Sequence, residues 1–210
     1  MALSAQSLIY SHQSFYQMLM RVLYGRYFDA RYQAVADEIP AGVSVVDVCA
    51  GSGYLYLKYL RLKHVQYLGL DISPQLVHWA QQHGVPMQPS NVWADEIPIG
   101  DIVVMQASLY QFIPQADMIL RRLLKAARDR VIVTEPIRNL ASSRNPLFSI
   151  VGRRLTVPAR NAERYHAQRF DYRSLMQLFE SIDSFERARL LPGGREVIGI
   201  FKGQFTQASS

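Results

Sequence analysis

Short apolar runs alternate with helical periods through the middle of the chain. The apolar runs have the length of β-strands and lie at residues 43–49, 65–70, 86–92, 101–106 and 131–134. Between them, apolar residues recur at helical spacing over residues 54–62, 74–82 and 114–128. Ser73 and Pro74 open the second of these helical segments, as an N-cap and a first helical residue. Strands that alternate with helices predict a parallel sheet with right-handed crossovers and helices on both faces.

The two ends of the chain follow other patterns. Residues 14–39 place apolar side chains at helical spacing, which predicts an N-terminal helical cap over residues 1–40. Its aromatic residues either pack against the sheet or cover a ligand crevice. Near the other end, Asp171 is a suitable N-cap for a helix over residues 170–182. Apolar runs at 185–191 and 196–205 flank a Pro-Gly-Gly turn, so we expect a β-hairpin with an antiparallel C-terminal strand.

Residues 137–169 show no sustained period and carry many arginines. A segment of this length without regular structure more often has a function than serves only as a connection. We therefore expect it to be an insertion that covers the substrate, within a single domain of residues 1–210. Arginine suits bidentate contacts to carboxylate or phosphate, although a solvated basic face explains the same composition.

The bulk properties of the chain are those of an ordinary globular protein, with 49% hydrophobic and 19% charged residues. One cysteine excludes an internal disulfide and fits a reducing compartment. The sequence shows no secretory signal and no apolar run of the roughly 20 residues that a membrane span needs. These features predict a cytoplasmic location. The net charge of +6 is compatible with an anionic substrate, with nucleic acid, or with solubility alone.

A glycine turn directly follows the first predicted strand. Asp47 lies within the strand, and Gly51 and Gly53 follow it at the spacing of a nucleotide-binding turn. The dinucleotide motif G-x-G-x-x-G requires a third glycine, and Tyr56 stands at that position. The turn therefore favours S-adenosylmethionine over a nicotinamide as the ligand.

Three segments together resemble the ordered motifs of class I S-adenosylmethionine-dependent methyltransferases: residues 46–53, 69–73 and 101–104. The C-terminal hairpin is similar to the reversed last strands of that family. The resemblance implies a doubly wound, mostly parallel seven-stranded sheet with an antiparallel C-terminal strand and helices on both faces. It also implies an enzyme that converts S-adenosylmethionine to S-adenosyl-L-homocysteine.

The resemblance implies a cofactor site at the carboxyl ends of the first four strands. Asp71 would accept both ribose hydroxyls, and Asp47 would either face the ammonium group or cap the loop. Asn91 would reach the adenine edge, with Asp95 as the alternative. Cys49 stands where the family has glycine, and we do not interpret it as a nucleophile. The expected cofactor-binding residues are Asp47, Cys49, Ala50, Gly51, Gly53, Asp71, Ile72, Asn91, Val92 and Gln106.

The acceptor side carries less specific signals. Tyr110 and Gln111 follow the fourth strand, where the methyl group and the acceptor should meet, although Tyr110 is equally explained by packing. His166 has an intrinsic pKa suited to a general base, with a packed or solvated histidine as the alternative. The expected substrate residues are Tyr110, Gln111, Arg138, Arg144, Tyr165 and Arg169, and the candidate catalytic residues are His166 and Tyr110. We find no Cys/His cluster for a metal.

The sequence therefore predicts methyl transfer to a small or lipid-like acceptor, and a carboxylate or phosphate on that acceptor would explain the arginines. A tRNA or rRNA methyltransferase is the first alternative, because the same arginines would bind phosphates. It lacks support from an added RNA-binding domain or an amino-methyltransferase motif. The second alternative is a non-catalytic relative that binds S-adenosylmethionine. The oligomeric state is not predicted.

Overall fold

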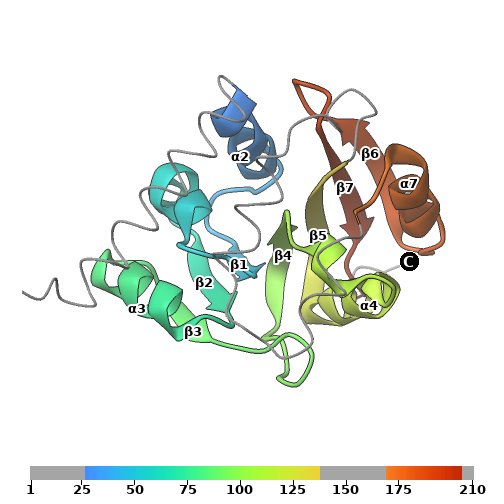
Figure 1. Cartoon of the computed structure of the whole chain (residues 1–210). Helices are drawn as coiled ribbons and strands as arrows, with labels where there is room; N and C mark the ends of the chain where they lie inside the picture. The colour runs from blue at the N-terminus through green and yellow to red at the C-terminus, as the bar shows by residue number, and fades with distance from the viewer. Residues whose placement is uncertain (1–26, 138–168, 205–210) are drawn as a thin grey trace, which may run out of the picture.

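A computed structural model describes residues 27–137 and 169–204 (Figure 1). Seven strands form one sheet in the order β3-β2-β1-β4-β5-β7-β6. Neighbouring strands are parallel from β3 to β5, and β7 is antiparallel to both β5 and β6. The predicted mostly parallel sheet with one reversed C-terminal strand is thereby confirmed.

The strands are β1 (Ser44–Val48), β2 (Gln66–Asp71), β3 (Met87–Pro89), β4 (Gly100–Gln106), β5 (Ala127–Pro136), β6 (Phe185–Leu190) and β7 (Glu196–Lys202). The α-helices are α2 (Tyr27–Asp37), α3 (Pro74–Gln82), α4 (Ala116–Ala126) and α7 (Tyr172–Glu180). Three short helical segments of other types complete the described elements: η1 (Tyr56–Leu60), η2 (Arg61–Lys63) and η3 (Leu109–Phe112).

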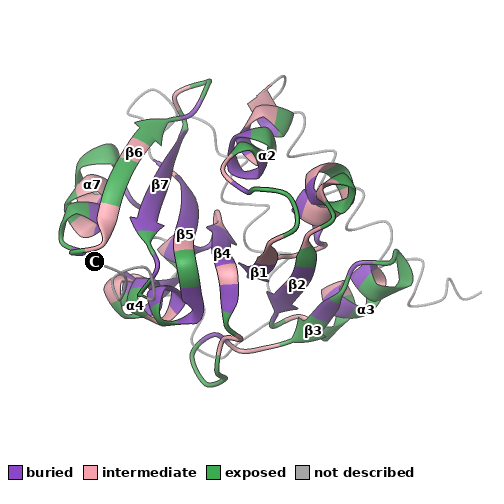
Figure 2. Cartoon of the chain, turned by 180° about the vertical axis from the view of Figure 1, so that it is seen from behind, coloured by how far each residue is buried: buried purple, intermediate pink, exposed green. Residues whose placement is uncertain are grey.

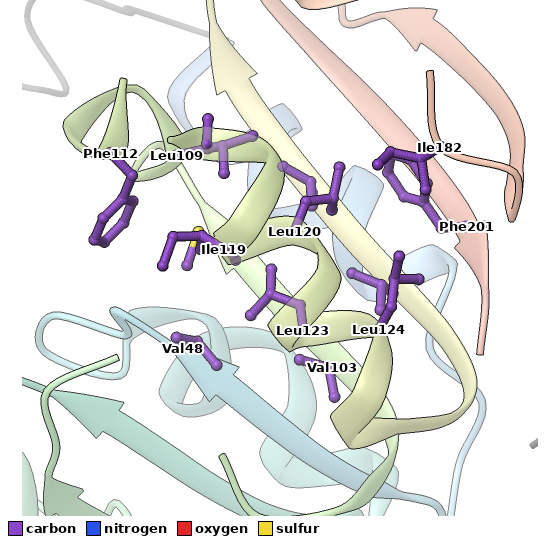
Figure 3. Close-up of a cluster of buried hydrophobic side chains, with 14 of the residues drawn as sticks. Val48, Val103, Leu109, Phe112, Ile119, Leu120, Leu123, Leu124, Ile182 and Phe201 are labelled. Atoms are coloured by element: carbon purple, nitrogen blue, oxygen red, sulfur yellow. The ribbon is translucent and has the colours of Figure 1, made fainter. Parts of the chain in front are cut away.

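Two apolar layers enclose the sheet, because alternate residues of each strand point to opposite faces. Val46, Val103 and Val131 pack with α4, η3 and α7 on one face. Figure 3 shows Val103 with Leu120 and Leu123 of α4 in this cluster. Val45 and Ile132 pack with α2, η1 and α3 on the other face. The interior strands β4 and β7 are largely buried, whereas the edge strand β6 is largely exposed (Figure 2). Helices on both faces confirm the predicted layers.

Capping chemistry places two helices where the sequence predicts them. The Ser73 side chain accepts a hydrogen bond from the Leu76 N–H at the start of α3. Asp171 and Ser174 form a reciprocal capping box at the start of α7. Local sequence is sufficient in these two cases because each bond joins residues three positions apart.

Two predicted strand boundaries were wrong, and one predicted helix is of a different type. Residues 54–63 are helical, but after Tyr54 and Leu55 they form the π-helix η1 and the 3₁₀-helix η2. Tyr54 and Tyr59 both donate to Asp29 on α2. Strand β5 begins at Ala127, since Arg128 extends the strand and reaches Asp101 on β4. Strand β3 ends at Pro89, where a turn follows. Of the predicted N-terminal helix over 14–39, only α2 lies within the described residues.

The two glycines of the turn after β1 have different structural roles. Both have left-handed backbone angles, with φ of 61° at Gly51 and 68° at Gly53. A Cβ on Gly53 would lie 2.6 Å from Cγ1 of the buried Val85, whereas a Cβ on Gly51 would meet nothing within 4 Å. Gly53 is therefore required for packing, and Gly51 leaves open space above the turn.

We predict that Gly53→Ala destabilises the protein more than Gly51→Ala does. Both variants strain the left-handed backbone by about 1–2 kcal/mol. Only Gly53→Ala adds the overpacking cost against Val85, about 1–3 kcal/mol. Urea unfolding of the two variants measures the difference, and equal destabilisation would show that Val85 yields to the added methyl group.

Candidate functional site

The candidate site lies at the carboxyl edge of the sheet, between β1 and β4. Strand order reverses there, because β1 connects onward to β2 on one side and β4 connects onward to β5 on the other. Ligands of doubly wound sheets bind in the crevice at such a switch point. The turn after β1 and the segment after β4 therefore form the two rims of the crevice.

Both rims begin with a strained residue. Cys49 follows β1 with φ 59°, and Ala107 follows β4 with φ 49°. Left-handed angles are uncommon for residues with a side chain and cluster at functional sites. The angle at Cys49 also explains why glycine suits that position. Burial raises the pKa of the Cys49 thiol to about 12, so the thiol stays protonated near neutral pH and is a poor nucleophile.

Asp71 connects the end of β2 to the glycine turn. One carboxylate oxygen accepts a 2.8 Å hydrogen bond from the Gly51 N–H, and the other accepts a 2.9 Å bond from the Ser73 N–H. Burial raises the pKa of Asp71, and these two N–H donors oppose that rise. The structure therefore brings together Gly51 and Asp71, which the sequence predicted for one site. Ala50, beside them, donates its N–H to the Leu70 carbonyl.

Asp47 lies beneath the turn with only 3% of its surface exposed. Its carboxylate accepts a 2.8 Å hydrogen bond from the Tyr67 hydroxyl on β2. Burial raises the pKa of Asp47 to about 7, the Tyr67 bond opposes the rise, and the Asp71 charge adds to it. Among the described residues it is Asp71, rather than Asp47, whose carboxylate binds the loop N–H. A buried carboxylate of this kind suits a cationic ligand group.

The rim beyond β2 holds the predicted adenine contacts. Ile72 is 68% exposed beside Asp71, and Val92 is buried. The two alternatives Asn91 and Asp95 belong to one turn, in which the Asp95 carboxylate accepts the Asn91 N–H and the Asn91 side-chain oxygen accepts the Trp93 N–H. Trp93 adds an exposed ring over this rim, 41% accessible. This rim offers exposed apolar surface next to polar turn groups.

The rim after β4 holds the predicted acceptor residues. Gln106 ends β4, half-buried, and Tyr110 and exposed Gln111 lie in η3. The Arg169 guanidinium lies 3.5 Å from the centre of the Tyr110 ring, so the structure joins two of the predicted residues. Four others, Arg138, Arg144, Tyr165 and His166, lie outside the described residues.

Sequence reasoning missed Glu135 as a site residue. Glu135 lies near the end of β5, is fully buried, and accepts a 2.9 Å hydrogen bond from the Leu109 N–H at the start of η3. An available signal was the pattern Val-Ile-Val-Thr-Glu, an acid at the end of an apolar strand like Asp71. Within the described residues, no group of three or more His, Cys, Asp or Glu side chains is arranged to hold a metal ion. The helices of the described segments are all too short or too polar to cross a membrane.

No family model matches the sequence, and no curated protein matches it. Solved structures do match. A TehB-like S-adenosylmethionine-dependent methyltransferase from Corynebacterium glutamicum has a TM-score of 0.59 and 15% identity, over 92% of this chain and 98% of that one. Magnesium protoporphyrin IX methyltransferase from Synechocystis, with bound S-adenosylhomocysteine, has a TM-score of 0.59 and 16% identity, over 97% of this chain and 89% of that one.

The matching structures also include a protein with another reaction. The [4+2]-cyclase SpnF has a TM-score of 0.62 and 15% identity, over 84% of this chain and 80% of that one. Sequence identities this low show a shared fold only. The reaction has to be inferred from the residues of the site. The chain has the class I, Rossmann-like fold of S-adenosylmethionine-dependent methyltransferases.

Proposed function

We propose that this protein transfers the methyl group of S-adenosylmethionine to a small-molecule acceptor. The observation that carries the proposal is the hydrogen bond from the Gly51 N–H to the Asp71 carboxylate, at the switch point of a methyltransferase-like sheet. This bond holds the glycine turn beside the acid that would bind ribose. The proposal includes a cytoplasmic location, which the single cysteine supports.

The residues present fit the cofactor. Open space above Gly51 leaves room for a ligand against the turn. Asp71 would accept hydrogen bonds from the ribose hydroxyls through lone pairs that the backbone N–H groups leave available. Asp47 would face the ammonium group, and Ile72 would pack on the adenine with Asn91 and Val92 beside it. The bound cofactor supplies a methyl group on a sulfonium, so catalysis needs chiefly alignment.

The acceptor would bind over the rim after β4. Gln106 would contact the methionine portion of the cofactor, and Tyr110 and Gln111 would contact the acceptor. Arg169, stacked on Tyr110, is placed to hold a carboxylate or phosphate of the acceptor. We propose the same role for Arg138 and Arg144, with Tyr165 beside them and His166 as a candidate base.

We predict that S-adenosylhomocysteine raises the Tm of the wild-type protein and that Asp71→Ala abolishes the shift. At one hundred times its Kd, a ligand stabilises by about 2.7 kcal/mol. At this chain length that corresponds to about 5–10 °C. Thermal unfolding with and without the ligand makes the measurement.

Asp101→Ala is the matched control for Asp71→Ala. Asp101 also accepts a hydrogen bond from a backbone N–H, that of Ser44, at 2.8 Å. It lies near the amino end of β4, whereas the candidate site lies at the carboxyl ends of the strands. The control should lower the Tm and keep the ligand shift. A wild-type protein that shows no shift would contradict the proposal, and binding of RNA with steep salt dependence would favour the nucleic-acid alternative.

We predict that the affinity for S-adenosylhomocysteine increases as the pH rises towards 7. The pKa of Asp47 is about 7 in the ligand-free protein, so the carboxyl must lose a proton to pair with the ligand ammonium group. Titration calorimetry in buffers of different ionisation enthalpy should detect proton release below pH 7. Asp47→Asn should bind weakly and release no proton.

The same substitution should change stability with a definite sign. A pKa raised from 3.8 to about 7 means that stability is present at low pH and is lost as the pH rises through 7. The Tm of Asp47→Asn relative to the wild type should therefore increase between pH 5 and pH 8, by about 2–4 °C for each kcal/mol. A constant difference would show that Asp47 is already ionised in the ligand-free protein.

A further inference from the structure

One carboxyl oxygen of Glu135 accepts a hydrogen bond, and the other has no hydrogen-bond partner in the part of the chain that the structure describes. Its Oε2 accepts the Leu109 N–H at 2.9 Å, and Leu109 itself is buried in the apolar layer under η3 (Figure 3). Its Oε1 is buried and has no hydrogen-bond partner among the described residues. Buried polar atoms are nearly always satisfied, so a vacant one calls for a donor that the ligand-free protein does not supply.

Anchoring η3 does not require an acid at this position. A glutamine oxygen would accept the Leu109 N–H equally well, without the cost of burying a carboxyl group. Burial raises the pKa of Glu135 well above its usual value, and the charge of Glu196 raises it further. The charge of Arg169 and the N–H groups of Leu109 and Tyr110 oppose the rise. The acid is thus retained at a cost to stability, as is common for functional groups.

The vacant oxygen belongs to the acceptor side of the proposed crevice. Thr134 on β5 pairs with Gln106 on β4, and Glu135 is the next residue along β5. Strand β4 separates β5 from β1, which places Glu135 about 10 Å across the sheet from the glycine turn, or two strand spacings. Its hydrogen-bonded neighbour Leu109 begins η3, which carries Tyr110. A group bound over η3 would therefore lie on the Glu135 side of the crevice, with the Glu135 side chain fully buried next to Leu109.

We propose that Glu135, rather than His166, is the catalytic base of the methyl transfer, and that Oε1 receives the proton of a hydroxyl or amine on the acceptor. This inference rests on the proposed function, because it assumes that the methyl donor lies along the crevice. In the step, the acceptor oxygen or nitrogen forms a bond to the methyl carbon. The carbon–sulfur bond breaks with its electron pair going to sulfur, and the acceptor proton goes to Oε1.

The proposal narrows the acceptor class. A hydroxyl or amine fills the vacant position at Oε1 as a donor, whereas a carboxylate oxygen has no proton to give and would face Glu135 as a like charge. An anionic group elsewhere on the same acceptor would lie on the Arg169 side, above the Tyr110 ring. The methylated atom would then be oxygen or nitrogen.

Glu135→Gln is the test variant, and Thr134→Val is its matched control. Glutamine keeps the shape of the side chain and the acceptor for Leu109 but cannot take up a proton. Thr134 is also fully buried, and within the described part of the chain its hydroxyl also lacks a hydrogen-bond partner. It precedes Glu135 on the same strand and points to the opposite face of the sheet.

The first measurement needs no acceptor. Because the pKa of Glu135 is raised in the folded protein, wild-type stability is present at low pH and is lost as the pH rises through that raised value. The Tm of Glu135→Gln relative to the wild type should therefore increase between pH 5 and pH 9, and Thr134→Val should show a constant difference. A constant difference for Glu135→Gln would overturn the inference, because Glu135 would then be no more than a neutral or permanently ionised anchor.

The second measurement is methyl transfer to catechol, 2-phenylethylamine and benzoate as probes. We expect the catechol or the amine to be methylated and benzoate not. Glu135→Gln should lower kcat by about 10²–10⁴-fold and remove the loss of rate at low pH, while KM stays within a few fold. Thr134→Val should retain the wild-type kcat.

The possible failures are distinguishable. Wild-type protein that does not bind S-adenosylhomocysteine refutes the proposed function. If the wild type binds it but Glu135→Gln keeps kcat and the low-pH loss of rate, only the role of Glu135 is refuted. Methylation of benzoate alone would have the same effect. If none of the three probes is methylated, a constant Tm difference for Glu135→Gln between pH 5 and pH 9 still overturns the inference.

Discussion

The hydrogen bond between the Gly51 N–H and the Asp71 carboxylate is the constraint on which the site depends. It joins residues 20 positions apart and fixes the turn after β1 to the end of β2. The second Asp71 oxygen holds the Ser73 N–H, and Ser73 in turn caps α3. One carboxylate therefore sets the position of the turn, the direction of the following helix and the acid that faces the crevice.

Burying three carboxyl groups at the carboxyl edge of the sheet costs electrostatic free energy. Asp47, Asp71 and Glu135 are all buried there, and burial raises the pKa of each one. Hydroxyl and backbone N–H donors satisfy part of each group, through Tyr67, Gly51 and Leu109. Apolar residues at these positions would fold more stably, so the acids are best explained by ligand groups that donate hydrogen bonds or carry positive charge.

Local pattern was sufficient for the features that depend on neighbours in sequence. Strand periods, the Ser73 and Asp171 caps and the terminal hairpin all follow from residues a few positions apart, as does the presence of an acid at Asp71. The missed features depend on distant contacts: Tyr67 with Asp47 across 20 positions, and Glu135 with Leu109 across 26. The π-helix η1 is also in long-range contact, since its Tyr59 donates a hydrogen bond to Asp29 on α2.

The chain has a positive net charge, whereas the described residues at the site include several acids. The charges at the site are the better guide to the ligand. The whole chain carries a charge of +6, which by itself suggests an anionic partner. Asp47, Asp71 and Glu135 are instead buried at the carboxyl edge of the sheet, and Arg169 lies over the Tyr110 ring. A ligand that is cationic over β1, donates hydrogen bonds at β2 and β5, and is anionic only beyond η3 would match this arrangement. Asp47 and Glu135 lie on separate strands with β4 between them. Under the proposed function, Asp47 would face the cationic methyl donor, and Glu135 would face a neutral or partly anionic acceptor.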